Sequence, residues 1–145
     1  MRRSNLIAVI LFAAFALTTI GNAQDENRTY NENAVKNLVK GIKSENEGLK
    51  KSSIYYAGKY KITDAVDALV DKMVKEKDPD TRILIALSLY QIGDYKGLEA
   101  VKEQALNDND ERVKSMSALI FNEFYKNYTG DQKLSDYFVA KDHSK

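Results

Sequence analysis

The stretch DPDTRILIALSLYQIGD, residues 78–94, decides how the rest of the chain is interpreted. It begins with Asp78 and Asp80 around the chain's only proline, continues as a mostly apolar run and closes with Gly93 and Asp94. Aspartate and proline favour the start of a helix, and glycine favours its end. The stretch therefore predicts a helix in which Asp80 accepts hydrogen bonds from the free N–H groups of the first turn. So many apolar residues indicate that the helix contacts neighbours on several sides.

A second observation is that this pattern recurs at a fixed interval, from Leu49 to Thr81 and again from Thr81 to Val113. The recurring segments are GLKKSSIYYAGKY, TRILIALSLYQI and RVKSMSALIFNEF, each preceded by another segment of helical periodicity. Aligned positions of matching character are Lys50, Arg82 and Lys114; Ile54, Ala86 and Ala118; and Ala57, Leu89 and Phe121. No stretch alternates apolar and polar residues over the length of a strand. The sequence thus predicts an all-α fold of three helix pairs joined by short turns.

These segments resemble the short HEAT-like repeats of bacterial proteins. DPDTRILIALSLYQIGD has their Asp-Pro turn, basic residue in the first turn and closing Ile-Gly-Asp, and NDNDERVKSMSALIFNEF repeats the turn and the apolar columns. The resemblance covers residues 33–127 and implies a short right-handed α-solenoid of three HEAT-like pairs, at about 32–61, 62–93 and 94–128. Tetratricopeptide repeats, with a period of about 34, are the alternative, but their Trp and Leu-Gly features are missing from the first helices.

The N-terminus has the pattern of a secretory signal peptide. Arg2 and Arg3 precede an uncharged, mostly apolar run from Leu6 to Ile20. This run is shorter than the roughly 20 residues that cross a bilayer, and small residues follow where a signal peptidase cleaves. We expect cleavage after Ala23, no stable membrane span afterwards, and a flexible lead-in at 24–31. Export without any cysteine favours a bacterial periplasmic or secreted protein.

Composition argues against several functional classes. The net charge of +1 does not indicate a nucleic-acid-binding face, which needs an excess of clustered Lys and Arg. The chain has no cysteine, and its one histidine, His143, lies close to the C-terminus, so neither a zinc-like ligand set nor a histidine proton shuttle is predicted. NDNDE at 107–111 lacks the glycine and distal glutamate of a calcium loop. We predict no catalytic residue, no metal and no cofactor.

Two functional classes follow from these observations. The first is an exported, non-catalytic interaction module or scaffold that binds a protein or peptide, or a second copy of itself, in a helical groove. The second is a small periplasmic enzyme or ligand-binding protein that uses Tyr and Asp/Glu side chains in that groove. A repeat architecture distributes side chains along a surface and does not require a catalytic centre, which favours the first class.

The helix at 81–92 supplies the candidate site. Ile83, Leu87 and Tyr90 fall on the side away from its predicted core face, and Tyr55 and Leu119 are the equivalents of Leu87 in the other repeats. Second helices line the concave surface of a HEAT-like stack, so the resemblance implies that these five residues form a partner-binding groove. The alternative is that the helix is buried on every side and has no free face.

Two further expectations concern charges and the C-terminus. The basic positions 50, 82 and 114 are expected to pair with acidic residues of the preceding turn, such as Asp78 or Asp110, in a structural ladder. Residues 129–145 are interpreted as a capping segment and tail, in which a short helix at 133–139 covers the open end of the stack.

Overall fold

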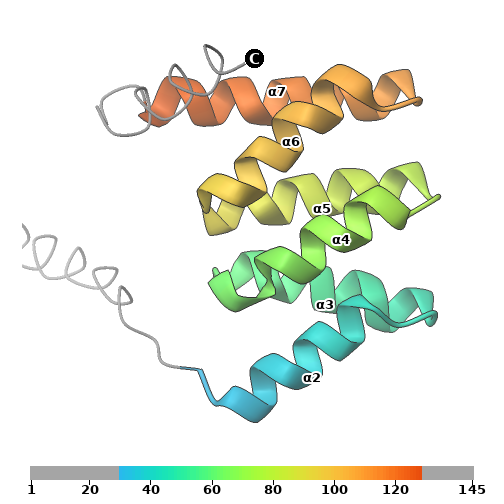
Figure 1. The fold of residues 1–145 in the computed structure, drawn as a ribbon, viewed down its shortest axis with the longest axis vertical. Helices are drawn as coiled ribbons and strands as arrows, with labels where there is room; N and C mark the ends of the chain where they lie inside the picture. The colour runs from blue at the N-terminus through green and yellow to red at the C-terminus, as the bar shows by residue number, and fades with distance from the viewer. Residues whose placement is uncertain (1–29, 129–145) are drawn as a thin grey trace, which may run out of the picture. The chain divides into compact units, whose positions relative to one another are not determined.

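The computed structural model describes residues 30–128, and every regular element in this range is helical (Figure 1). A short 3-10 turn, η1 (Thr63–Ala65), precedes the third of six α-helices. The α-helices are α2 (Glu32–Ile42), α3 (Glu47–Lys59), α4 (Val66–Lys75), α5 (Pro79–Ile92), α6 (Tyr95–Asn107) and α7 (Glu111–Tyr128). The predicted signal peptide, most of the lead-in, the capping segment and His143 lie outside the described residues.

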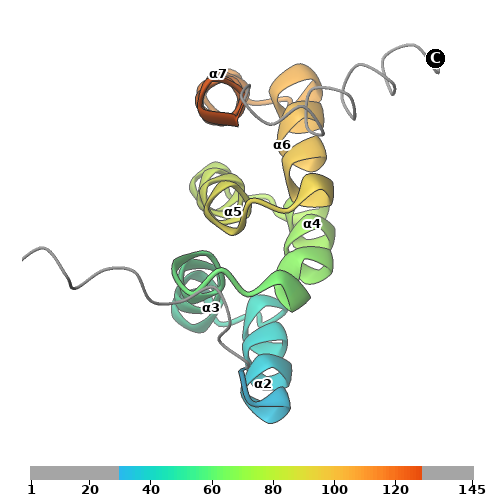
Figure 2. The ribbon, with the colours of Figure 1, turned by 90° about the vertical axis from the view of Figure 1, so that its left-hand side faces the viewer.

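The six helices stack as two layers (Figure 2). The first helices of the pairs, α2, α4 and α6, form one layer, and the second helices, α3, α5 and α7, form the other. Each second helix packs on the next one and on the first helix of its own pair. The pairs α2–α3, α4–α5 and α6–α7 are called the first, second and third repeats below. This arrangement confirms the predicted all-α solenoid of three helix pairs.

Turn chemistry sets the ends of the helices. The side chains of Asn46, Asp94 and Asp110 each accept a hydrogen bond from a backbone N–H at the start of the following helix. The expectation for Asp80 is wrong, because the residue before the helix is Asp78 and its carboxylate accepts from the Thr81 hydroxyl at 2.6 Å. Proline has no N–H and favours the first helical position, so α5 begins at Pro79 and its N-cap falls one residue earlier.

The core explains why α5 is so apolar. This helix packs against α3 on one side, α7 on the other, and both α4 and α6 beneath. Ile85, Ala86 and Leu89 are fully buried, and Ser88 is nearly so. The alternative prediction, that α5 is buried on every side, is nevertheless wrong, because 38% of the Leu87 surface is exposed.

Candidate functional site

A row of large apolar side chains crosses the outer surface of the second helices. Tyr55 on α3, Leu87 on α5 and Leu119 on α7 are exposed by 46%, 38% and 63%. They occupy equivalent positions in the three repeats, as the fixed interval of the sequence pattern predicts. We call this the second-helix row, and the surface that carries it the second-helix face.

The other two predicted site residues are only half-buried. Ile83 lies one helical turn before Leu87, and Tyr90 lies almost one turn after it. The Tyr90 ring meets the buried Phe124 ring edge-on, at 6.4 Å between centroids. Tyr90 therefore contributes to the core of the third repeat as well as to the surface.

The structure brings two of the predicted residues into one pocket at the junction of the first and second repeats. Its volume is about 410 Å³. The lining residues come from the end of α3, the turn after it and the end of α5: Tyr55, Gly58, Lys59, Lys61, Tyr90 and Gln91. We call this the tyrosine–lysine pocket. Leu87, Leu119 and Ile83 are not part of its lining.

Tyr55 and Lys59, which line this pocket, belong to a cluster of three tyrosine rings and one lysine. Tyr55 meets Tyr56 edge-on at 5.4 Å between centroids, and Tyr56 stacks on Tyr60 at 5.8 Å. The Lys59 ammonium lies 5.7 Å from the Tyr55 ring centre and 5.7 Å from that of Tyr60. Lys59 and Lys61 were not among the predicted site residues, although their signal is present in YYAGKYK at 55–61, which combines three tyrosines with two lysines.

Gly58 sets the close approach of α3 to α5 beside the pocket. A Cβ atom placed on Gly58 would lie 2.7 Å from the Cα of Ser88, which is backbone and cannot move aside cheaply. Ser88 is itself small and buried. A residue larger than glycine would separate the two helices and displace Tyr55 and Lys59 relative to Tyr90.

Lys61 shapes the turn at the end of α3 with a backbone conformation that favours glycine. Its φ of 50° is the only positive φ of a non-glycine residue within 30–128. Gly93, with φ of 76°, ends α5 at the equivalent position of the second repeat, as predicted for it. Left-handed backbone crowds a Cβ atom, so a lysine there is strained where a glycine is not.

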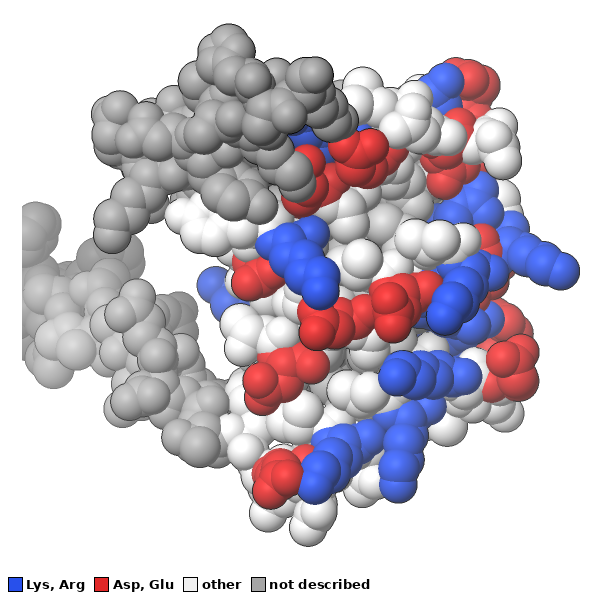
Figure 3. Space-filling view, in the orientation of Figure 1, with Lys and Arg blue, Asp and Glu red and all other residues white. Residues whose placement is uncertain are grey.

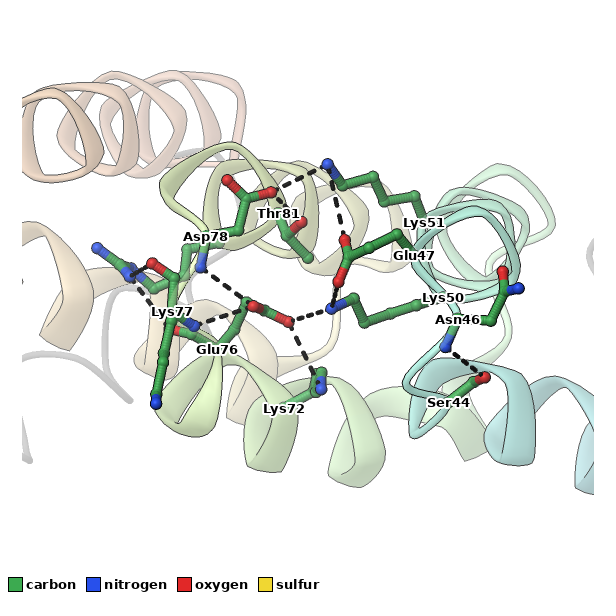
Figure 4. Close-up of polar contacts among 11 residues, drawn as sticks. Ser44, Asn46, Glu47, Lys50, Lys51, Lys72, Glu76, Lys77, Asp78 and Thr81 are labelled. Carbon is green, nitrogen blue, oxygen red and sulfur yellow. Dashed lines mark hydrogen bonds and ion pairs between the residues drawn. The ribbon is translucent and has the colours of Figure 1, made fainter.

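At the opposite end of the second helices, charges are buried and paired (Figure 4). The Lys50 ammonium, 3% exposed, lies 2.8 Å from the Glu76 carboxylate, and Lys72 lies 3.5 Å from the same group. Burial by itself would raise the pKa of Glu76, but hydrogen bonds from Lys50 and the Asp78 N–H, with the nearby Lys72 charge, lower it to about 2. Burial would lower the pKa of Lys50, yet its hydrogen bonds to Glu47 and Glu76 raise that pKa above the ordinary value.

The same arrangement recurs at the next junction. Arg82, the equivalent of Lys50, contacts Asp108, the equivalent of Glu76, with both closest distances at 2.9 Å. Arg82 also donates to the carbonyl oxygens of Glu76 and Lys77 at 3.1 Å. The pairing partner thus lies in the turn of the following repeat, and the expectation of a partner in the preceding turn is wrong. In the first two repeats, the basic residue near the start of the second helix therefore reaches toward the next repeat, whereas Lys114 in the third pairs with Glu111 of its own helix at 3.0 Å.

The surface of the other layer, formed by α2, α4 and α6 (Figure 2), is called the first-helix face, and it carries many charged side chains (Figure 3). Figure 3 shows Lys and Arg interspersed there with Asp and Glu, without a large field of either sign. A second pocket, of about 770 Å³, opens between α4 and α6 and is lined by residues that include Val74, Arg82 and Glu103. On this face, among the residues that the structure describes, the two signs of charge alternate and form no basic stripe (Figure 3).

Within residues 30–128 no three His, Cys, Asp or Glu side chains lie close enough together to hold a metal ion. The tyrosine–lysine pocket has no carboxylate in its lining, so tyrosines and acidic groups do not converge there as the enzyme alternative requires. None of the helices in this range is long and apolar enough to cross a membrane.

The fold and the equivalent positions define a helical-repeat protein whose stacked pairs share one continuous core. The family model for HEAT repeats matches residues 35–120, more than half of the chain, so the protein belongs to the HEAT repeat family. This match supports the HEAT-like interpretation over the tetratricopeptide one. HEAT repeats generally mediate protein–protein interactions and are typically non-enzymatic. A comparison with curated proteins finds no match.

Proposed function

We propose that this chain is an exported, non-catalytic interaction module that holds a partner protein or peptide on its second-helix face. The observation that carries the proposal is the second-helix row, in which Tyr55, Leu87 and Leu119 stay exposed at equivalent positions of all three repeats. Contiguous apolar surface on a folded domain usually marks a partner site, and tyrosine is favoured in such sites. The interior of the stack does not require these side chains to be apolar.

The export part of the proposal rests on the N-terminal sequence. Arg2 and Arg3, the apolar run to Ile20 and the small residues that end at Ala23 form a complete secretory signal pattern. We place the mature protein in the periplasm or outside a bacterial cell. Mass spectrometry of the protein recovered from the periplasm or medium should find Gln24 as the first residue. A chain that retains Met1 would contradict export by cleavage.

Binding can be tested without knowing the natural partner. A displayed library of random peptides is panned against protein purified after expression of the full chain. The affinity of selected peptides is then measured by fluorescence anisotropy. Leu87→Asp and Leu119→Asp should each weaken binding by roughly tenfold or more, because a charge placed in an apolar contact must be desolvated.

Leu106→Asp is the matched control, because Leu106 is 61% exposed but lies on α6 in the other layer. This variant should keep the wild-type affinity. Failure to select any binding peptide, or selected peptides that are insensitive to both row variants, would contradict the proposal. Sedimentation measured over a range of protein concentrations separates peptide binding from self-association through the same face.

A further inference from the structure

The charges of the second helices are distributed unevenly between their two ends. Basic residues in the first halves of these helices are all in ion pairs: Lys50, Lys51, Arg82, Arg112 and Lys114. Lys59 and Lys61, at the other end of the first repeat, form no ion pair with any residue that the structure describes. The pocket that they line contains no carboxylate. Among the second helices and the turn after α3, positive charge without a paired carboxylate in the described residues is therefore found at the tyrosine–lysine pocket.

The side chains around this pocket suit a carboxylate. An ammonium group donates up to three hydrogen bonds, and tyrosine hydroxyls can donate as well. The Lys59 ammonium lies over the Tyr55 and Tyr60 rings. Because a cation is attracted to the face of an aromatic ring, the two rings help to fix the position of this ammonium. Charge-assisted hydrogen bonds to a carboxylate are stronger than neutral ones. The rings also offer apolar surface to the residues next to that carboxylate.

The backbone at Lys61 gives a second, independent reason to assign a role to the pocket. Its φ of 50° is the left-handed conformation that Gly93 adopts without strain in the next repeat. The backbone of this turn therefore favours glycine, and Lys61 occupies the position despite its backbone strain. Residues with a strained backbone cluster at ligand-binding and active sites, where the strain accompanies a functional role.

Charge also changes along the stack. The exposed position of Lys59 is occupied by Gln91 in the second repeat and by Glu123 in the third. Of these three positions, only the first therefore offers an ammonium group to an acidic ligand. This gradient gives a bound peptide one direction along the second-helix row.

We propose that the tyrosine–lysine pocket binds the carboxylate side chains of an acidic segment in the partner's chain, while apolar residues of that segment lie on Tyr55 and Leu87. This inference rests on the proposed function and names the chemical class of the partner. Lys59 and Lys61 donate to the carboxylates. The second-helix row supplies the apolar contact, which does not depend on charge.

The test compares two labelled peptides of about ten residues, a length that spans several neighbouring side chains of a binding face. In one peptide glutamates alternate with leucines, and in its twin every glutamate is replaced by glutamine. Binding to protein purified after expression of the full chain is measured by fluorescence anisotropy at low salt. The glutamate peptide should bind roughly tenfold more tightly than its twin, and added NaCl should reduce this advantage because it screens exposed charges.

Variants assign the effect to the two lysines. The double substitution Lys59→Gln, Lys61→Gly should remove the advantage of the glutamate peptide and leave the affinity of the glutamine twin unchanged. Because Lys61→Gly relieves backbone strain, the protein that carries it should melt at or above the wild-type temperature. A loss of peptide affinity in this protein then cannot be the result of unfolding. The matched control is Lys40→Gln, Lys43→Gln, which makes an equal change of charge at exposed residues of the first repeat's other helix and of the turn after it.

Each outcome distinguishes the two proposals. Equal affinity for the two peptides, or equal loss with the control pair, overturns the acidic-segment inference. If Leu87→Asp still weakens both peptides in that case, binding on the second-helix row stands and only the inference about charge falls. If Leu87→Asp has no effect either, both proposals fall. If the wild-type protein is a dimer and the Lys59, Lys61 variant is a monomer, the pocket binds a second copy of the chain. That result would overturn the proposal that it binds an acidic segment of another protein.

Discussion

Arg82 and Asp108 lie one repeat apart and form a forked pair, with Nε to Oδ2 and Nη2 to Oδ1 distances of 2.9 Å. Lys50 and Glu76 form the corresponding pair at the preceding junction, at 2.8 Å. Both pairs are largely buried, and both join the start of a second helix to the turn of the next repeat. Each junction between repeats is therefore held by one buried ion pair in addition to the apolar core.

Removal of one partner from such a pair should be costly. We expect Arg82→Ala to lower the free energy of unfolding by about 3 kcal/mol, because it leaves Asp108 buried without its cation and two carbonyl groups without their donor. Urea titration followed by circular dichroism measures this difference.

Arg112→Ala is the matched control. Arg112 pairs with Asp80 at 2.6 Å, but the two side chains are exposed by 60% and 66%. An exposed pair contributes about 1 kcal/mol or less, so this variant should unfold close to the wild-type midpoint. Equal destabilisation by the two substitutions would show that burial of the pair at 82 and 108 has no special role.

The lowered pKa of Glu76 predicts how stability depends on pH. The pKa is about 2 in the folded chain and 4.5 as the ordinary value. The folded state therefore favours the ionised carboxylate, and this contribution is present above pH 4.5 and lost as the pH falls toward 2. At neutral pH Glu76→Gln should be less stable by an amount on the order of 2 kcal/mol, and this gap should close in that acid window.

Unfolding by urea at a series of pH values from neutral to strongly acidic measures the gap. Glu45→Gln provides the control, because Glu45 is exposed in the turn between α2 and α3. That variant should follow the wild-type curve throughout. A gap between wild type and Glu76→Gln that stays constant as the pH falls would contradict the assignment of the acid sensitivity to Glu76.

Periodicity made the fold and the row predictable. The fixed interval between repeats places Tyr55, Leu87 and Leu119 at equivalent positions, so knowledge of one exposed position identifies the other two. Turn residues located the ends of the helices closely. Asp80 was misassigned because two aspartates flank Pro79, and the preference of proline for the first helical position decides between them.

Contacts between repeats were harder to predict. A fixed spacing shows that Lys50 and Arg82 are equivalent, but it does not show whether their side chains reach the preceding or the following turn. The tyrosine–lysine pocket depends on the contact of Gly58 with Ser88 and on the left-handed backbone of Lys61. Neither feature has a periodic signature. The segment YYAGKYK at 55–61 contains most of the residues that line the pocket, but the sequence does not show that Tyr90 and Gln91 lie against them.

The glycine contact leads to a third prediction. Gly58→Ala would place a methyl group 2.7 Å from the Ser88 Cα atom, so α3 and α5 must move apart. Overpacking of this kind should lower the free energy of unfolding by about 2 kcal/mol. Thermal unfolding followed by circular dichroism measures the change.

Gly48→Ala is the control for this substitution within the same helix. A Cβ atom on Gly48 would meet only the Asn46 side-chain oxygen, at an ordinary contact distance of 3.5 Å. Because alanine is a better helix former than glycine, this variant should melt at or above the wild-type temperature. A Gly58→Ala protein as stable as Gly48→Ala would mean that the two helices pack less closely than the structure shows.

The last prediction separates surface from core on α5 itself. Leu87 is 38% exposed, whereas Leu89, two residues further along, is completely buried and contacts Gly97 of α6. Leu87→Asp places its charge in water and should change the free energy of unfolding by about 1 kcal/mol or less, mainly through the lower helix propensity of aspartate. Leu89→Asp places the charge in the core without a partner, which should cost several kcal/mol and unfold the domain. Circular dichroism and urea titration of the two variants decide the matter. If Leu87→Asp also unfolds the chain, Leu87 belongs to the core, and the exposed apolar row on which the proposed partner site depends is not free to bind anything.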